Sequence, residues 1–189
     1  RKTDMRDAQW IATLLRAGLL KGSFIPDKTF RELRHLTRYR KSIVRDITAQ
    51  KNRIDKFLQS SGFRFTAFLS DAFGASGRNI IRHLMEYGNI SREALDRCLK
   101  TQTRKRIDEI LIALNGSLSE HQRGFLRMIF GHLEALEQHR HTVEDAITKE
   151  ITKHEEALSL LCSIPGIDVT AAAAIIAEIG TDMSAFPDS

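Results

Sequence analysis

The chain has 189 residues, of which 42% are hydrophobic and 28% are charged, with a formal net charge of +5. This composition fits one ordinary folded domain or parts of two, and it excludes a disordered tail. Three prolines, eleven glycines and few alternating β-branched runs argue against an all-β chain. No apolar stretch approaches the roughly 20 residues that cross a bilayer, and no signal-peptide pattern opens the chain, so we expect a cytoplasmic protein with no membrane partner.

The first predicted helix covers residues 8–20, whose apolar side chains recur at helical spacing. Asp4 and Asp7 lie at its start, and residues three apart on a helix share a face, with Cβ atoms about 5 to 6 Å apart. Two carboxylates that close can hold Mg²⁺, which usually takes one or two carboxylates and keeps several waters. The alternative is a helix cap, in which Asp4 accepts a backbone N–H bond and Asp7 complements the helix dipole. Both interpretations can hold together.

Positive charge is concentrated between Lys28 and Lys56, a segment that contains ten basic and three acidic residues. The resulting +7 exceeds the net charge of the whole chain. An arginine-rich helix of this kind favours phosphate binding, although a charged face that serves only solubility is the alternative. The candidate nucleic-acid-binding residues are Lys2, Arg31, Arg34, Arg38, Arg40, Lys41, Arg45, Lys51 and Arg53.

The same basic segment carries an apolar face on which residues follow alternating steps of three and four. These residues are Leu33, Leu36, Ile43, Ile47, Ile54 and Phe57, with Arg40 and Gln50 at the skipped positions. The pattern predicts a coiled-coil seam on one helix over residues 30–61, about 48 Å long, that Gly62 ends.

A second long helix is predicted from Ser119 to about Leu160, with the same three-four rhythm and a capping box formed by Ser119 and Gln122. Two such helices can pair antiparallel within one chain or with the copy in another subunit. We favour some pairing between chains, because a bare two-helix hairpin has little core of its own. A homo-oligomer is therefore expected.

Residues 63–115 form a predicted insert of short amphipathic helices, over 79–87, 91–99 and 103–114. Its phenylalanines at 63, 65, 68 and 73 could stack on bases, but we assign them to packing because aromatic residues at helical spacing usually form core.

A tight turn at Pro165-Gly166 precedes a small-residue helix that ends at Gly180. This pattern resembles a helix-hairpin-helix element, in which exposed turn amides contact a phosphate, and Gly166 is the candidate residue. An ordinary turn between two helices is the alternative.

Several motifs in order resemble the DEDD transposases of the IS110 insertion-sequence family, over nearly the whole chain. They are KTDMRDA, the LLRAGLL helix, RELRHLTRYRKSIVRDITAQKNRI, the second long helix and SIPGIDVTAAAAIIAEIG. The resemblance implies a RuvC-like domain with four metal-binding acids, in which Asp4 and Asp7 are the third and fourth catalytic carboxylates and Mg²⁺ is the cofactor. The first Asp, the Glu and the serine nucleophile of the family have no counterpart here, and neither Ser184 nor Ser189 is assigned that role.

The resemblance further implies DNA strand cleavage and rejoining for transposition, guided by a noncoding bridge RNA that pairs with donor and target DNA. Partners would be DNA, the guide RNA and further copies of the chain, with nucleoid association when DNA is bound. We expect an all-α internal fragment that is inactive alone. Its parts would be a RuvC-like end (1–26), a coiled-coil domain (27–157, insert 63–115) and the start of a transposase domain (158–189). The rival hypothesis is a non-catalytic helical dimerisation or nucleic-acid-binding module.

Overall fold

The computed structural model describes residues 3–20, 27–69 and 71–185. The predicted all-α class is confirmed, because the described residues contain no strand and only one isolated bridge, between Phe63 and Leu114. They divide into two compact units, one formed by 38–149 and one by the described parts of 1–37 and 150–189. We call these the central unit and the terminal unit and describe each by itself. The domain boundaries expected at 26/27 and 157/158 remain predictions.

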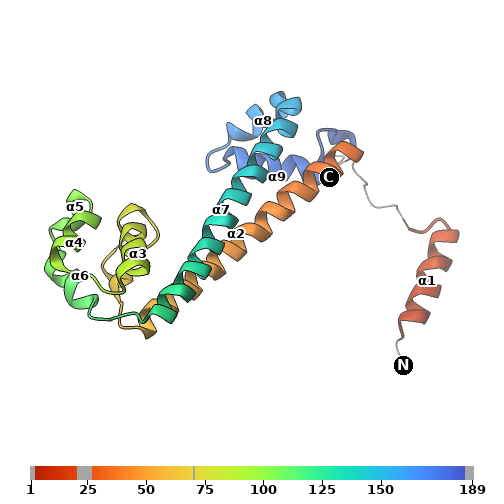
Figure 1. Cartoon of the computed structure of the whole chain (residues 1–189). Helices are drawn as coiled ribbons and strands as arrows, with labels where there is room; N and C mark the ends of the chain where they lie inside the picture. The colour runs from red at the N-terminus through yellow and green to blue at the C-terminus, as the bar shows by residue number, and fades with distance from the viewer. Residues whose placement is uncertain (1–2, 21–26, 70, 186–189) are drawn as a thin grey trace. The chain divides into compact units, whose positions relative to one another are not determined.

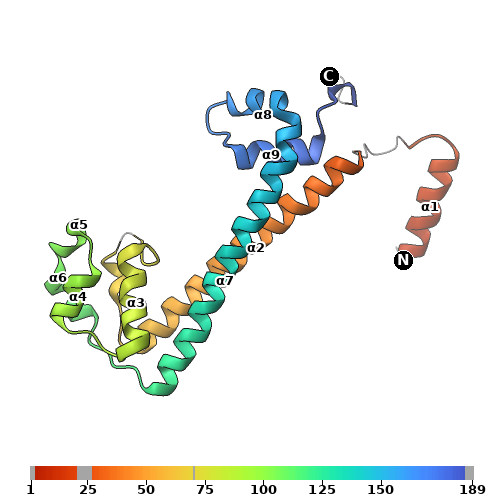
Figure 2. The same ribbon diagram turned by 45° about the horizontal axis from the view of Figure 1, so that its top comes forward.

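Two long helices build the central unit, α2 (Lys28–Ser60) and α7 (Glu120–Ile151), and both continue into the terminal unit. Within the central unit they run side by side in opposite directions (Figures 1 and 2). The two apolar seams supply much of the core between them, with Ile43, Ile47 and Ile54 from α2 and Leu126, Leu133, Val143 and Ile147 from α7. At the end of the α2 seam, Leu58 is buried in place of the predicted Phe57, which is half-buried. Gln50 interrupts the seam at 1% exposure, and its amide Nε2 donates to the Ile129 carbonyl over 2.6 Å.

The predicted helix ends are largely confirmed. Gly62, with φ of +89°, follows α2, and a left-handed backbone of this kind favours glycine. The capping box at the start of α7 is present, because the Gln122 amide N–H donates to Ser119 Oγ over 3.3 Å and the Ser119 N–H donates to Gln122 Oε1 over 2.9 Å.

The prediction of one unbroken helix to Leu160 was wrong. A 3₁₀ turn, η2 (Thr152–His154), follows α7 and separates it from α8 (Glu155–Cys162). His154 leaves the helical region with φ of −125° and ψ of 42°. After this turn, α8 packs against α9 (Val169–Ile179).

Short helices form the insert of the central unit. They are η1 (Phe65–Ala67), α3 (Ala75–Tyr87), α4 (Arg92–Cys98), α5 (Thr101–Arg104) and α6 (Ile107–Ala113). The predicted helices are present, except that the one expected over 103–114 is broken between α5 and α6. Ile80, Ile81, Leu84, Leu95 and Ile110 are fully buried and form its core.

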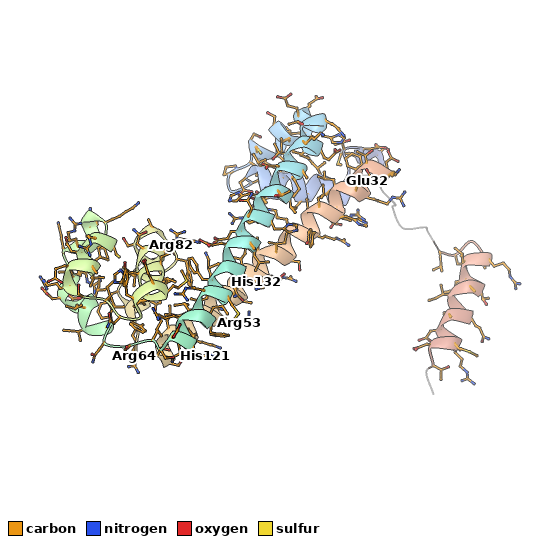
Figure 3. The ribbon with its side chains drawn as sticks, viewed as in Figure 1. Glu32, Arg53, Arg64, Arg82, His121 and His132 are labelled. Carbon is orange, nitrogen blue, oxygen red and sulfur yellow. The ribbon has the colours of Figure 1, made fainter. Side chains whose placement is uncertain are left out.

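Ion pairs join α3 to α7. The Arg78 guanidinium donates to both carboxylate oxygens of Glu137, over 2.7 and 2.8 Å. Arg82, labelled on α3 in Figure 3, pairs with Glu134 at 2.9 Å. Gly77 lets α3 approach its own preceding loop, because a Cβ there would lie 1.8 Å from the Ala72 carbonyl oxygen.

The terminal unit contains α1 (Asp4–Arg16), the first turns of α2, the α8–α9 hairpin and η3 (Met183–Ala185). The hairpin buries Ala172, Ala173, Ile176 and Ala177 of α9. Arg34 of α2 binds the end of α9, donating to the carbonyls of Ala177 and Glu178 over 3.2 and 2.7 Å. Across the described residues, no helix is long and apolar enough to span a membrane.

Candidate functional site

The acidic pair opens α1, which begins four residues earlier than predicted. Thr3 is the N-cap residue and makes no side-chain capping bond, so Asp4 is the first helical residue rather than the cap. Asp7 follows within the first turn, and both acids are exposed. Neither carboxylate has an ion pair or hydrogen bond among the described residues. The acids lie where they complement the positive end of the helix dipole.

The two carboxylates continue into an apolar stripe on the same face of α1. Ile11 and Leu15 follow Asp4 and Asp7 at helical spacing and are 56% and 63% exposed. Because α1 buries no residue, its apolar face has no packing partner in the described parts of the chain.

Two unpaired carboxylates one turn apart fit a Mg²⁺ ion, which accepts one or two protein carboxylates and keeps the rest of its shell as water. No group of three or more His, Cys, Asp or Glu side chains that could hold a metal occurs in the described residues. The pair therefore offers part of a ligand set.

The structure separates the predicted basic residues of α2 into two groups. The first group makes contacts within the chain. Arg40 pairs with Glu144 at 2.7 Å, and Arg34 pairs with Glu178 at 3.0 Å. Lys51 lies 3.8 Å from the Glu137 carboxylate and 5.5 Å from the centre of the Phe73 ring. Arg53 donates to the Oε1 of buried Gln50. Arg34, Arg40 and Lys51 thus link α2 to other helices, whereas the Arg53 bond lies within α2.

The second group is distinguished by its exposure to solvent, although Arg38 within it also takes part in an interaction within the chain. Arg38, Lys41, Arg45 and Lys56 recur in steps of three, four and eleven residues, with Thr48 and Asn52 between them on the same face. We call these six residues the basic stripe. It extends about 27 Å along α2, at 1.5 Å per residue, and lies opposite the buried seam. Lys56 was missed as a candidate, although its spacing of eleven from Arg45 was the signal that could have found it.

Two further candidates lie outside the stripe. Arg31 is exposed near the start of α2, within the terminal unit. Lys2 lies outside the described residues.

The predicted hairpin between two helices is present, and its turn is exposed (Figure 2). Gly166 has φ of +90°, and a Cβ there would meet no atom within 4 Å. Asp168 caps α9 by accepting a bond from the Ala171 N–H over 2.7 Å. The amides of Gly166 and Val169 make no hydrogen bond within the described residues. The turn can thus donate to a phosphate, beside a carboxylate that already occupies the helix start.

Comparison with known proteins places the first part of this arrangement in a family. The family model DEDD_Tnp_IS110, whose description is "Transposase", matches residues 1–62. The match takes in the acidic pair, the seam residues of α2 and the basic stripe. No curated protein matches the chain. Residues 1–62, about a third of the chain, are therefore similar to the IS110 family of DEDD transposases.

Proposed function

We propose that this chain is part of a Mg²⁺-dependent recombinase that cuts and rejoins DNA strands during insertion-sequence transposition. In this proposal α1 contributes metal ligands, whereas the long helices mainly bind nucleic acid and join subunits. One observation carries the proposal: the family match covers both the unpaired acids of α1 and the basic stripe of α2.

Asp4 and Asp7 are proposed as catalytic carboxylates that hold Mg²⁺ together with acids from outside the described residues. The bound ion would stabilise charge on the reacting phosphate and orient it. Among the described residues, neither carboxylate forms an ion pair, which leaves both available as ligands and supports this role.

The basic stripe is proposed to bind the phosphates of DNA and of a guide RNA, with release of counterions. Arg31, Lys2 and the turn amides at Gly166 would add contacts beyond the stripe. Arg34, Arg40 and Lys51 belong to the same predicted set, but their bonds to other helices favour a role in positioning those helices. Arg53, also in that set, is engaged by Gln50 of its own helix.

The helical region is also proposed to join copies of the chain, in the cytoplasm and at the nucleoid when DNA is bound. Because the apolar seams of the central unit are covered within the chain, such a contact would use other faces of the long helices. A non-catalytic nucleic-acid-binding module is the second candidate function, since the folded helix pair and its basic stripe make no use of Asp4 or Asp7.

A metal titration separates the two candidates. Mn²⁺ at millimolar concentration should broaden the backbone amide NMR signals of residues 4–8 first, and the D4N/D7N variant should remove that effect. E32Q is the matched control, because it removes an exposed carboxylate that pairs with Lys28 at 3.8 Å. Broadening that is unchanged in D4N/D7N would contradict the metal site and leave the binding module.

A further inference from the structure

A cavity of about 630 Å³ opens in the insert of the central unit. Its lining comes from three parts of the insert: Phe68, Leu69 and Asp71; the start of α3 at Gly74, Ala75 and Ser76; and Lys100, Gln102, Thr103 and Arg106. The volume lies within the range of small-molecule sites, roughly 300 to 1,000 Å³. Neither the acidic pair nor the basic stripe contributes to it.

The cavity carries more positive than negative charge. Lys100 is exposed and has no ion pair among the described residues. The Arg106 guanidinium carbon lies 5.4 Å from the centre of the Phe68 ring, a cation–π distance, and the same guanidinium pairs with Glu109 at 2.8 Å. Asp71 is the one acid in the lining, and its Oδ1 accepts the Phe73 N–H over 2.9 Å. Lys100 is thus the cation of the lining that no carboxylate among the described residues pairs with, while Arg106 is held by Glu109. The second oxygen of Asp71, Oδ2, lies beside Gly74, 3.0 Å from the position that a Cβ there would take.

The start of α3 adds hydrogen-bond donors to this charge. Its N-cap residue, Gly74, offers no side chain, and the amides of Ala75, Ser76 and Gly77 have no partner in the described residues. The Lys100 backbone N–H donates to Ser76 Oγ over 3.0 Å and so ties the two walls together. The positive end of a 13-residue helix therefore faces the same space as Lys100.

We propose that this cavity binds one unpaired nucleotide of a nucleic-acid strand, with the phosphate between Lys100 and the first turn of α3 and the base against Phe68 and Arg106. Aromatic rings and arginine planes stack on unpaired bases with little dependence on sequence. The inference rests on the proposed nucleic-acid binding, but it uses residues distinct from the basic stripe. It also gives half-buried Phe68 a second role besides the packing expected from the sequence.

The test compares three probes by fluorescence anisotropy or competition: an unpaired 12-nucleotide RNA, an RNA hairpin and free AMP. K100E and F68L should each weaken binding of the unpaired strand roughly tenfold and change hairpin binding less than twofold. K105E is the matched control, because Lys105 is exposed, lies beside Arg106 and does not line the cavity. Photo-cross-linking of 5-iodouridine in the unpaired strand should map to the peptide that contains Phe68.

Equal weakening of the strand and the hairpin by K100E and K105E would overturn the proposal, as would a cross-link elsewhere. Competition by AMP against the unpaired strand supports the proposal. Binding of AMP without binding of the strand would mean that the cavity takes a free nucleotide, and would overturn the proposal. Charge reversal of the basic stripe distinguishes a failure of this inference from a failure of the nucleic-acid binding proposed for the stripe. If stripe reversal abolishes hairpin binding while K100E leaves strand binding unchanged, only this inference fails. If K100E acts while stripe reversal does nothing, the cavity stands and the stripe fails.

Discussion

The helix α1 and the helix pair of the central unit use their apolar residues in opposite ways. On α1, Ile11 and Leu15 are more than half exposed, while Ile54 and Leu133 of the pair are 0% exposed. The predicted metal ligands lie on a helix that buries no residue, whereas the buried seams of α2 and α7 lie in the central unit, which has no predicted metal ligand. The comparison teaches that the stability and the proposed catalysis of this chain depend on different residues, which substitutions can separate.

The largest expected effect is on the seam. L133A should lower the free energy of unfolding by about 2 to 5 kcal/mol, because it removes a fully buried side chain and leaves a cavity. I11A, the matched substitution on α1, should change it by less than about 0.5 kcal/mol. Urea denaturation followed by circular dichroism measures both values. Equal effects of the two substitutions would contradict the separation.

Two glycines allow a similar comparison of a tightly packed and an open position within the central unit. G77A should destabilise by about 1 to 3 kcal/mol, because its Cβ would lie 1.8 Å from a backbone oxygen. G131A should raise the free energy of unfolding by about 0.5 to 1 kcal/mol, because Gly131 lies on the exposed face of α7, where a Cβ would have no atom within 4 Å. Thermal unfolding gives both signs, and a loss of stability in G131A would indicate a close contact at that face of α7.

The smallest expected effect concerns the pair formed by Arg40 and Glu144. Their side chains are 24% and 29% exposed, so solvent screens the interaction. A double-mutant cycle with R40A and E144A should give a coupling of about 0.5 to 1 kcal/mol in the free energy of unfolding. A coupling near zero would return Arg40 to the group of residues available for nucleic acid.

The long helices could be predicted because their apolar residues keep a strict three-four spacing, and Gly62 and the Ser119 capping box mark their ends. The break at residues 152–154 could not, since Ala157 and Leu161 continue the same spacing past it. The contact between α8 and α9, which follows the 3₁₀ turn, likewise leaves no mark on local periodicity.

The candidate site was predictable only in part, for a similar reason. Arg40 and Lys41 are neighbours in the sequence, but a step of one residue rotates a side chain about 100° around the helix. Arg40 consequently reaches Glu144 while Lys41 faces solvent. Partners such as Glu144 lie about a hundred positions away, so composition alone could not sort the basic residues. The role proposed for Asp4 and Asp7 rests on the family motif, because two acids one helical turn apart fit both a metal site and a helix start.

The central claim is that one face of α2 packs in the core of the central unit, while the opposite face, the basic stripe, binds nucleic acid. The most direct measurement is the affinity of the chain for structured RNA as a function of salt, in K41Q/R45Q and in the control R40Q, with unfolding measured on the same samples. We predict that K41Q/R45Q lowers the salt slope by about 2 and leaves the free energy of unfolding unchanged, while R40Q lowers stability and removes no more than one unit of slope. An unchanged slope in K41Q/R45Q would contradict the account.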